Sequence, residues 1–215
     1  DRDSAPNRGP RVFRTAIRLR VAVSGPPKQG ELYESLRMCD TLGEERERDA
    51  CYSGVFMQNL MALHDPSLPA PELDPAHPLH PCTDIAAKYE SQCYQRQTTH
   101  ALMTLGDDIA AVFDLCETLL PSVRTACHQG LGRDAAQQGL ITAGTEAAQH
   151  AYAANRCGLA PDQGAQADCL VGAVKALIRY HLRDDEARAF CGAVDPALRE
   201  GCRQVVDTAI RRPES

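Results

Sequence analysis

The chain has 215 residues, 43% of them apolar, which is enough to bury a core in one large or two small domains. Aromatic residues make up only 5%, tryptophan is absent and alanine is abundant, and this composition favours helices over sheets. No run of about 18 apolar residues occurs, so we expect no membrane-spanning helix. The net charge of −6 argues against a nucleic-acid-binding protein.

Residues 1–30, called the arm below, differ from the rest of the chain in charge. They carry seven basic and two acidic side chains, a net charge of +5, so residues 31–215 carry −11. Apolar and basic residues alternate in "TAIRLRVAV" (15–23), which is a weak strand pattern. We expect a basic extended arm whose Arg14, Arg18 and Arg20 contact an acidic protein surface, the chain's own body or anionic lipid headgroups.

Helical periodicity and capping residues recur from residue 31 onward. For example, Ile109, Val112, Phe113 and Cys116 share one helical face, Asp107 or Asp108 can cap that helix, and Pro121 suits the first turn of the next. We predict one helical-repeat domain over 31–215 with about nine helices. These cover residues 31–41, 44–64, 84–105, 108–119, 121–141, 145–157, 163–181, 185–194 and 196–211.

The predicted helices are interrupted by a proline-rich segment, "DPSLPAPELDPAHPLHPC" (65–82). Proline lacks the amide hydrogen that a helix interior requires, so we expect an extended loop of polyproline II character here.

The ten cysteines form a regular pattern of five neighbouring pairs. The separations within the pairs are 12, 11, 11, 12 and 11 residues, and the gaps between pairs alternate between long and short at 31, 23, 30 and 22. Structural zinc sites use cysteines two to four residues apart, and no such pair occurs. Disulfides between neighbours explain the even count best, with free buried thiols and a metal site as the alternatives. The cysteines are Cys39, Cys51, Cys82, Cys93, Cys116, Cys127, Cys157, Cys169, Cys191 and Cys202.

The stretch "CETLLPSVRTAC" (116–127) has a counterpart in "CGAVDPALREGC" (191–202), where Asp195 and Pro196 are the expected cap and first residue of a helix. Each stretch predicts a helix, a tight turn and a second helix, with one cysteine on either side of the bend. A disulfide between them would close an antiparallel helical hairpin at its bend. The pair Cys82/Cys93 departs from this plan because the proline-rich loop precedes Cys82, so its bond would tie the loop to the helix at 84–105.

This plan resembles the secreted cysteine-rich tetratricopeptide-like repeat proteins, in which each helical pair carries one disulfide near its bend. The resemblance covers residues 31–211 in plan only. The motifs "CYSG", "CHQG" and "CLVG" at 51, 127 and 169 share a glycine three residues after the cysteine, but the family's Gly/Tyr consensus is absent. The resemblance implies an all-α, disulfide-stapled α-solenoid that serves as a binding scaffold.

Few residues suggest chemistry. His77 and His80, with His64 nearby, are weak candidates for metal ligands, because a site needs further ligands. The other histidines are expected to be partly exposed helix residues: His100, His128, His150 and His181. The carboxylate clusters are explained by helix starts and pairing with arginine, and no known hydrolase or nucleotide-binding motif occurs.

One apolar segment is a candidate binding surface. In "FMQNLMALH" (56–64), Phe56 and Leu60 lie on one helical stripe, and Met57 and Met61 lie on a neighbouring one. This is wider than one core face needs, so either the proline-rich loop or a partner covers it.

These observations predict a non-catalytic scaffold or accessory subunit, periplasmic or secreted, that needs no cofactor and binds a protein, such as a subunit of a membrane-bound complex. Two alternatives stay open: a periplasmic metal- or haem-associated protein that uses His64, His77 and His80, and a hydrolytic enzyme whose site is assembled across repeats.

Overall fold

A computed structural model describes residues 31–63, 72–181 and 184–211, and within these ranges the chain is helical with no strand. This confirms the predicted all-α fold of disulfide-linked helices. Contacts between Cα atoms divide the chain into two compact units, with the boundary between residues 71 and 72. Each unit is described by itself below.

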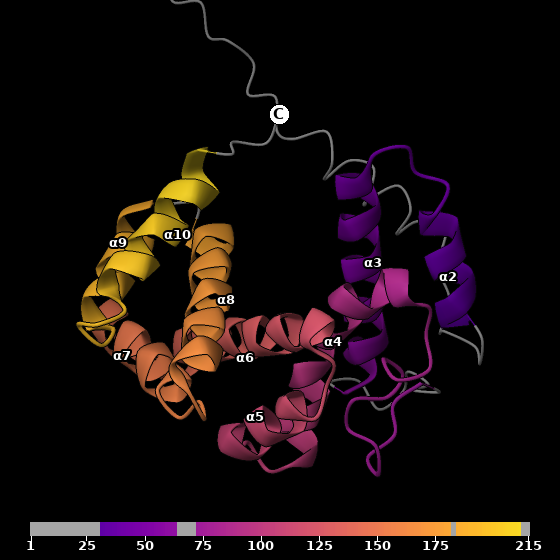
Figure 1. Ribbon diagram of the computed structural model, residues 1–215, viewed down its shortest axis with the longest axis horizontal. Coiled ribbons are helices and arrows are strands. Elements are labelled where there is room, and N and C mark those ends of the chain that lie inside the picture. Colours follow the sequence, from indigo (N-terminus) through magenta and orange to yellow (C-terminus); the bar gives the residue numbers. More distant parts are fainter. Residues whose placement is uncertain (1–30, 64–71, 182–183, 212–215) are drawn as a thin grey trace, which may run out of the picture. The chain divides into compact units, whose positions relative to one another are not determined.

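The first unit is a helical hairpin built from α2 (Glu31–Cys39) and α3 (Glu45–Leu60), with the 3₁₀ turn η1 (Met61–Leu63) at its end. Its two helices pack on each other, and Figure 1 shows them in indigo. The Arg48 guanidinium donates hydrogen bonds to the carbonyl oxygens of Leu42 and Gly43, at 3.0 and 2.9 Å, and so closes the turn between them. The Tyr52 hydroxyl donates to Asp40 at 2.6 Å, which links α3 to the end of α2.

The second unit contains seven helices among its described residues, and each falls where the periodicity predicted one. In Figure 1, α6 lies between α4 and α5 on one side and the group formed by α7 to α10 on the other. The helices are α4 (Ala87–Thr104), α5 (Ile109–Glu117), α6 (Pro121–Thr142), α7 (Glu146–Cys157), α8 (Gln163–His181), α9 (Asp184–Ala193) and α10 (Arg199–Arg211).

All ten cysteines are paired with their sequence neighbours, as predicted, and none is free. Four of the bonds join the two helices of a hairpin across its bend, and the fifth ties the turns before α4 to that helix. The five bonds are Cys39–Cys51, Cys82–Cys93, Cys116–Cys127, Cys157–Cys169 and Cys191–Cys202. They indicate that the protein folds in an oxidising compartment.

Local sequence explains where the helices begin. The side chain of Asp108 accepts a hydrogen bond from the amide of Ala111 at 3.1 Å, so Asp108 is the N-cap of α5. Asp107 beside it takes a left-handed conformation (φ 65°) in the turn after α4. Pro121 is the first residue of α6, a position where its missing amide hydrogen has no consequence.

Two predicted helix starts are wrong by three residues: α4 begins at Ala87 and not at residue 84, and the last helix begins at Arg199 and not at residue 196. The Asp195 side chain accepts from the amide of Ala197 at 2.8 Å, and its carbonyl accepts from the amide of Leu198 at 2.9 Å. These bonds form a turn around Pro196, and α10 begins only at Arg199. Of the proline-rich loop, residues 72–82 consist mainly of turns, while residues 65–71 and the arm lie outside the described residues. None of the helices of the described ranges is long and apolar enough to cross a membrane.

The second unit depends on glycines where its long helices cross. A Cβ atom at Gly132 of α6 would lie 1.7 Å from the carbonyl oxygen of Cys169 on α8. A Cβ atom at Gly172 of α8 would lie 1.9 Å from the carbonyl oxygen of Gln129 on α6. The two backbones therefore approach more closely than any other residue would permit.

We expect Gly132→Ala to lower the free energy of unfolding by about 3 kcal/mol, because α6 and α8 must separate to admit the methyl group. Gly201→Ala in α10 is the matched control: its Cβ would meet nothing within 4 Å, and alanine in a helix is favoured over glycine by up to about 1 kcal/mol. Urea denaturation of the oxidised proteins measures both. Equal stability of the two variants would contradict the close crossing.

We expect the double substitution Cys116→Ser and Cys127→Ser to lower the free energy of unfolding by about 3 kcal/mol, since it frees a closed loop of 11 residues in the unfolded chain. Urea denaturation gives the value, and peptide mapping without reduction checks that the other four bonds persist. An unchanged free energy would show that the staple contributes nothing to stability.

Candidate functional site

The candidate binding surface on the hairpin divides into a buried and an exposed part. Phe56 and Leu60 are buried, with 1% and 7% of their surface exposed. Met57 and Met61 are 38% and 41% exposed. The two methionines therefore present the apolar surface, and Phe56 and Leu60 support it from within.

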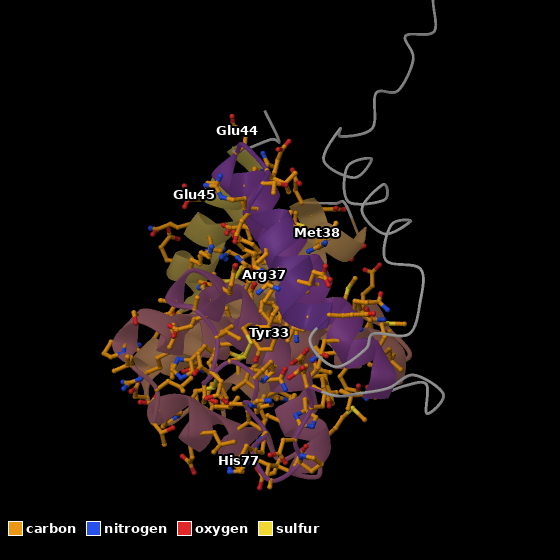
Figure 2. The ribbon with its side chains drawn as sticks, turned by 90° about the vertical axis from the view of Figure 1, so that its right-hand side faces the viewer. Tyr33, Arg37, Met38, Glu44, Glu45 and His77 are labelled. Atoms are coloured by element: carbon orange, nitrogen blue, oxygen red, sulfur yellow. A yellow bond between two sulfur atoms is a disulfide. The ribbon has the colours of Figure 1, made fainter. Side chains whose placement is uncertain are left out.

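The outer face of α2 is a second exposed surface of the hairpin. Tyr33, Arg37 and Met38 follow one another along the helix, and Glu44 and Glu45 stand at the start of α3 (Figure 2). Met38 is 40% exposed, so three of the protein's four methionines are exposed on this short hairpin. Methionine side chains are flexible and polarizable, which suits them to contacts with another protein.

The candidate residues of the arm, Arg14, Arg18 and Arg20, lie outside the described residues, and so does His64. The expected contact between the arm and an acidic surface thus stays a prediction.

The two described loop histidines each lie beside a carboxylate. His77 Nδ1 is 2.7 Å from Asp74 Oδ2, and this hydrogen bond, followed by the one from the Ala76 amide, lowers the pKa of Asp74. His80 Nδ1 is 3.0 Å from Asp84 Oδ2, and its Nε2 is 3.9 Å from Glu72 Oε2. Over the described ranges, no group of three or more histidine, cysteine, aspartate or glutamate side chains is arranged to hold a metal ion.

A buried histidine anchors the loop segment to α4. His100 is 3% exposed, and its Nδ1 donates to the carbonyl oxygen of Pro78 at 3.0 Å. Gln97, one turn earlier, donates to the same oxygen at 3.3 Å. Together with the Cys82–Cys93 bond, these contacts fix residues 78–82 on the helix.

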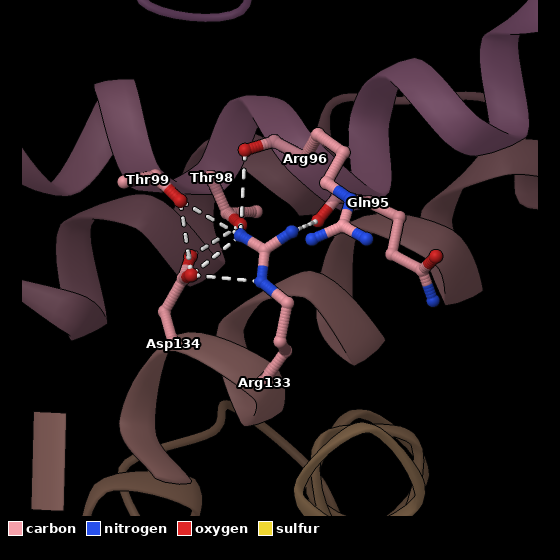
Figure 3. Close-up of polar contacts among 6 residues, drawn as sticks. All are labelled: Gln95, Arg96, Thr98, Thr99, Arg133 and Asp134. Carbon is pink, nitrogen blue, oxygen red and sulfur yellow. Dashed lines mark hydrogen bonds and ion pairs between the residues drawn. The ribbon is translucent and has the colours of Figure 1, made fainter. Parts of the chain in front are cut away.

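A charged network joins α4 and α6 (Figure 3). Arg133 and Asp134 of α6 form an ion pair, and only 11% and 9% of their side-chain surfaces are exposed. Asp134 also accepts from the hydroxyls of Thr98, at 2.6 Å, and Thr99, at 3.0 Å. Arg133 donates to the Gln95 carbonyl oxygen at 2.7 Å. Each charge is neutralised within the fold, so the network holds two helices together.

A second polar cluster lies where α5, α6 and α8 meet. His128 is 2% exposed; its Nε2 lies 3.1 Å from Glu117 Oε1 and its Nδ1 lies 3.7 Å from Asp168 Oδ2. The Thr125 hydroxyl donates to Asp168 at 2.8 Å, and Arg124 pairs with Glu117 at 3.2 Å. Histidine and carboxylates do converge here, but burial keeps the imidazole from a substrate, and Thr125 is already bonded.

The sequence-based expectation that His100, His128 and His150 are partly exposed is wrong, because all three are at most 5% exposed. Their partners come from segments far away in the sequence, such as Pro78 for His100 and Asp168 for His128. Helical periodicity does not reveal such partners. The glycines of "CHQGLGRD" (127–134) were the one local signal of a close helix crossing here. The side chain of His181 is not described.

Comparisons with protein families, curated proteins and solved structures give no match to this chain.

We expect Asp134→Ala to lower the free energy of unfolding by about 3 kcal/mol, because the Arg133 guanidinium is then buried without its counter-charge. The control is Asp207→Ala, which breaks the exposed pair that Asp207 makes with Arg188 at 2.6 Å and should cost about 0.5 kcal/mol. Urea denaturation compares the two. If both variants lose the same free energy of unfolding, the buried Arg133–Asp134 pair does not stabilise the fold more than an exposed pair does.

Proposed function

We propose that this protein is a non-catalytic scaffold or accessory subunit, periplasmic or secreted, that binds another protein through the surface of its helical hairpins. The observation that carries the proposal is the exposure of Met57 and Met61, each about two-fifths exposed, on a hairpin whose bend is closed by the Cys39–Cys51 bond. Exposed methionines on a preorganised helical surface are typical of protein-binding sites.

The distribution of polar groups supports a binding role over a catalytic one. The arrangement that comes nearest to a catalytic one, Glu117–His128–Asp168, has its imidazole buried. The Arg133 and Asp134 charges neutralise each other within the fold. In contrast, the side chains of Met57 and Met61 in the hairpin are exposed and are not buried in the core.

The disulfides supply the physical mechanism of the proposed binding. Each bond closes a short loop at the bend of a hairpin, so the two helices keep their relative position before a partner arrives. A surface that is already ordered loses less conformational entropy on binding, which leaves more of the contact energy as affinity.

The oxidising compartment indicated by the disulfides suggests where to find the partner. Capture with the tagged full chain from a native envelope fraction would isolate it, and the purified partner then allows a dissociation constant to be measured. A subunit of a membrane-bound complex is the kind of partner we propose.

We expect Met57→Ser with Met61→Ser to weaken binding to that partner about tenfold, because two apolar contacts are lost. Met103→Ser is the matched control, since Met103 is 50% exposed but belongs to α4 in the other unit. Isothermal titration calorimetry gives both constants. Equal weakening in the two variants, or none in either, would refute the proposed surface.

A further inference from the structure

The hairpin carries an excess of negative charge. Residues 31–63 contain seven acidic and three basic side chains, a net charge of −4. Glu44 and Glu45 are exposed at the start of α3, and neither forms a salt bridge with any described residue. Negative charge at this end of the hairpin is therefore not neutralised by the surrounding described side chains.

Two arginines lie near these carboxylates. Arg37 is exposed on the outer face of α2 between Tyr33 and Met38. A ligand must therefore direct its own positive charges toward Glu44 and Glu45 and away from Arg37. The Arg48 guanidinium donates to the carbonyl oxygens of Leu42 and Gly43 and so holds the turn of the hairpin. The pKa of Asp49 is raised by its burial and by the charge of Glu45, and Arg48 opposes this in part. The negative charge of Glu45 at the start of α3 thus contributes to the raised pKa of Asp49.

Apolar groups lie beside these carboxylates. Figure 2 shows Met38 and Tyr33 on the outer face of α2, with Glu44 and Glu45 past the end of that helix. Met38 is 40% exposed and Tyr33 is half-buried. The combined face suits a ligand that offers positive charges and aliphatic side chains together.

The chain itself contains a segment of that chemistry. Residues 14–23, "RTAIRLRVAV", alternate arginine with aliphatic residues in their central part, and they belong to the arm of net charge +5. We propose that the outer face of the α2–α3 hairpin, formed by Tyr33, Met38, Glu44 and Glu45, holds the basic segment 14–23 of the same chain.

The segment is able to reach this face. The arm is joined directly to α2 at Glu31, and α2 is nine residues long, or about 13 Å. Ten residues between Arg20 and Glu31 span at most roughly 35 Å when extended. The glycines and prolines of "SGPPKQG" (24–30) favour a reversal of the chain before the helix.

Covalent linkage makes weak ion pairs sufficient for docking. An exposed pair contributes little by itself, but a short tether holds the arm near its site at roughly millimolar effective concentration. Other occupants fit less well. A second copy of the chain carries the same segment but lacks the covalent tether, and an anionic lipid surface would be repelled by the carboxylates. The inference does not rest on the proposed function.

Trypsin cleavage of the full chain tests the inference, because the segment contains Arg14, Arg18 and Arg20. At low salt we expect slow cleavage after these residues relative to cleavage after Arg8, which lies outside the segment. High salt should accelerate it because it screens the ion pairs. Glu44→Gln with Glu45→Gln should accelerate it about fivefold, the factor expected when two exposed pairs are lost. Glu44 makes no capping hydrogen bond, so this change spares α3.

The control variant is Glu146→Gln with Glu200→Gln, which removes the same two charges from exposed positions on α7 and α10. Its cleavage rate should equal that of the unchanged protein. Equal rates in both double variants, or rapid cleavage of the unchanged protein at low salt, would overturn the inference.

Photo-crosslinking provides an independent measurement. Benzoylphenylalanine in place of Phe13 should form crosslinks to residues 31–45 of the same chain, as mass spectrometry of a mixture of isotopically light and heavy protein can show. Crosslinks only to residues 72–211, only between light and heavy chains, or none at all would each refute docking of the arm on its own hairpin.

Discussion

The local disulfide across the bend of a helical hairpin is the constraint on which the rest of this structure depends. A chain with 5% aromatic residues has few large side chains with which to hold two helices together. Each bond spans only 11 or 12 residues, so it fixes a helix against its sequence neighbour. It does nothing to fix one hairpin against the next, and that task falls to residues between the staples.

The glycine three residues after a cysteine takes on part of that task. Cys127 and Cys169 are each the seventh residue of the second helix of a hairpin, and each bonds to the first helix. Gly130 and Gly172 lie about one turn further on and pack against the preceding long helix, α4 for Gly130 and α6 for Gly172. The cysteine of this motif thus bonds the second helix of a hairpin to the first, and the glycine lets the same helix pack against the preceding long helix. Gly54, in the equivalent position of α3, has no neighbour within 4 Å.

The features that could be predicted from the sequence are the local ones. Cysteine spacing and helical periodicity predicted the five pairings and the nine helices of the described ranges, because both depend on residues less than about 20 positions apart. The start of α10 was missed because Asp195 can bond to its own turn as well as cap a helix. The burial of His128 was missed because its partner Asp168 lies 40 positions away on another hairpin.

The placement of charge and of exposed apolar side chains differs between the two units. In the second unit, polar groups that come close to the core are used internally: Arg133 neutralises Asp134, and His128 lies between two carboxylates. In the hairpin, the exposed carboxylates of Glu44 and Glu45 form no ion pair with a described residue, and Met38, Met57 and Met61 are exposed on the same unit. Unused charge and exposed apolar surface are the two features that a protein or peptide contact requires. These two features are the reason for proposing the hairpin, the smaller unit, as the binding surface.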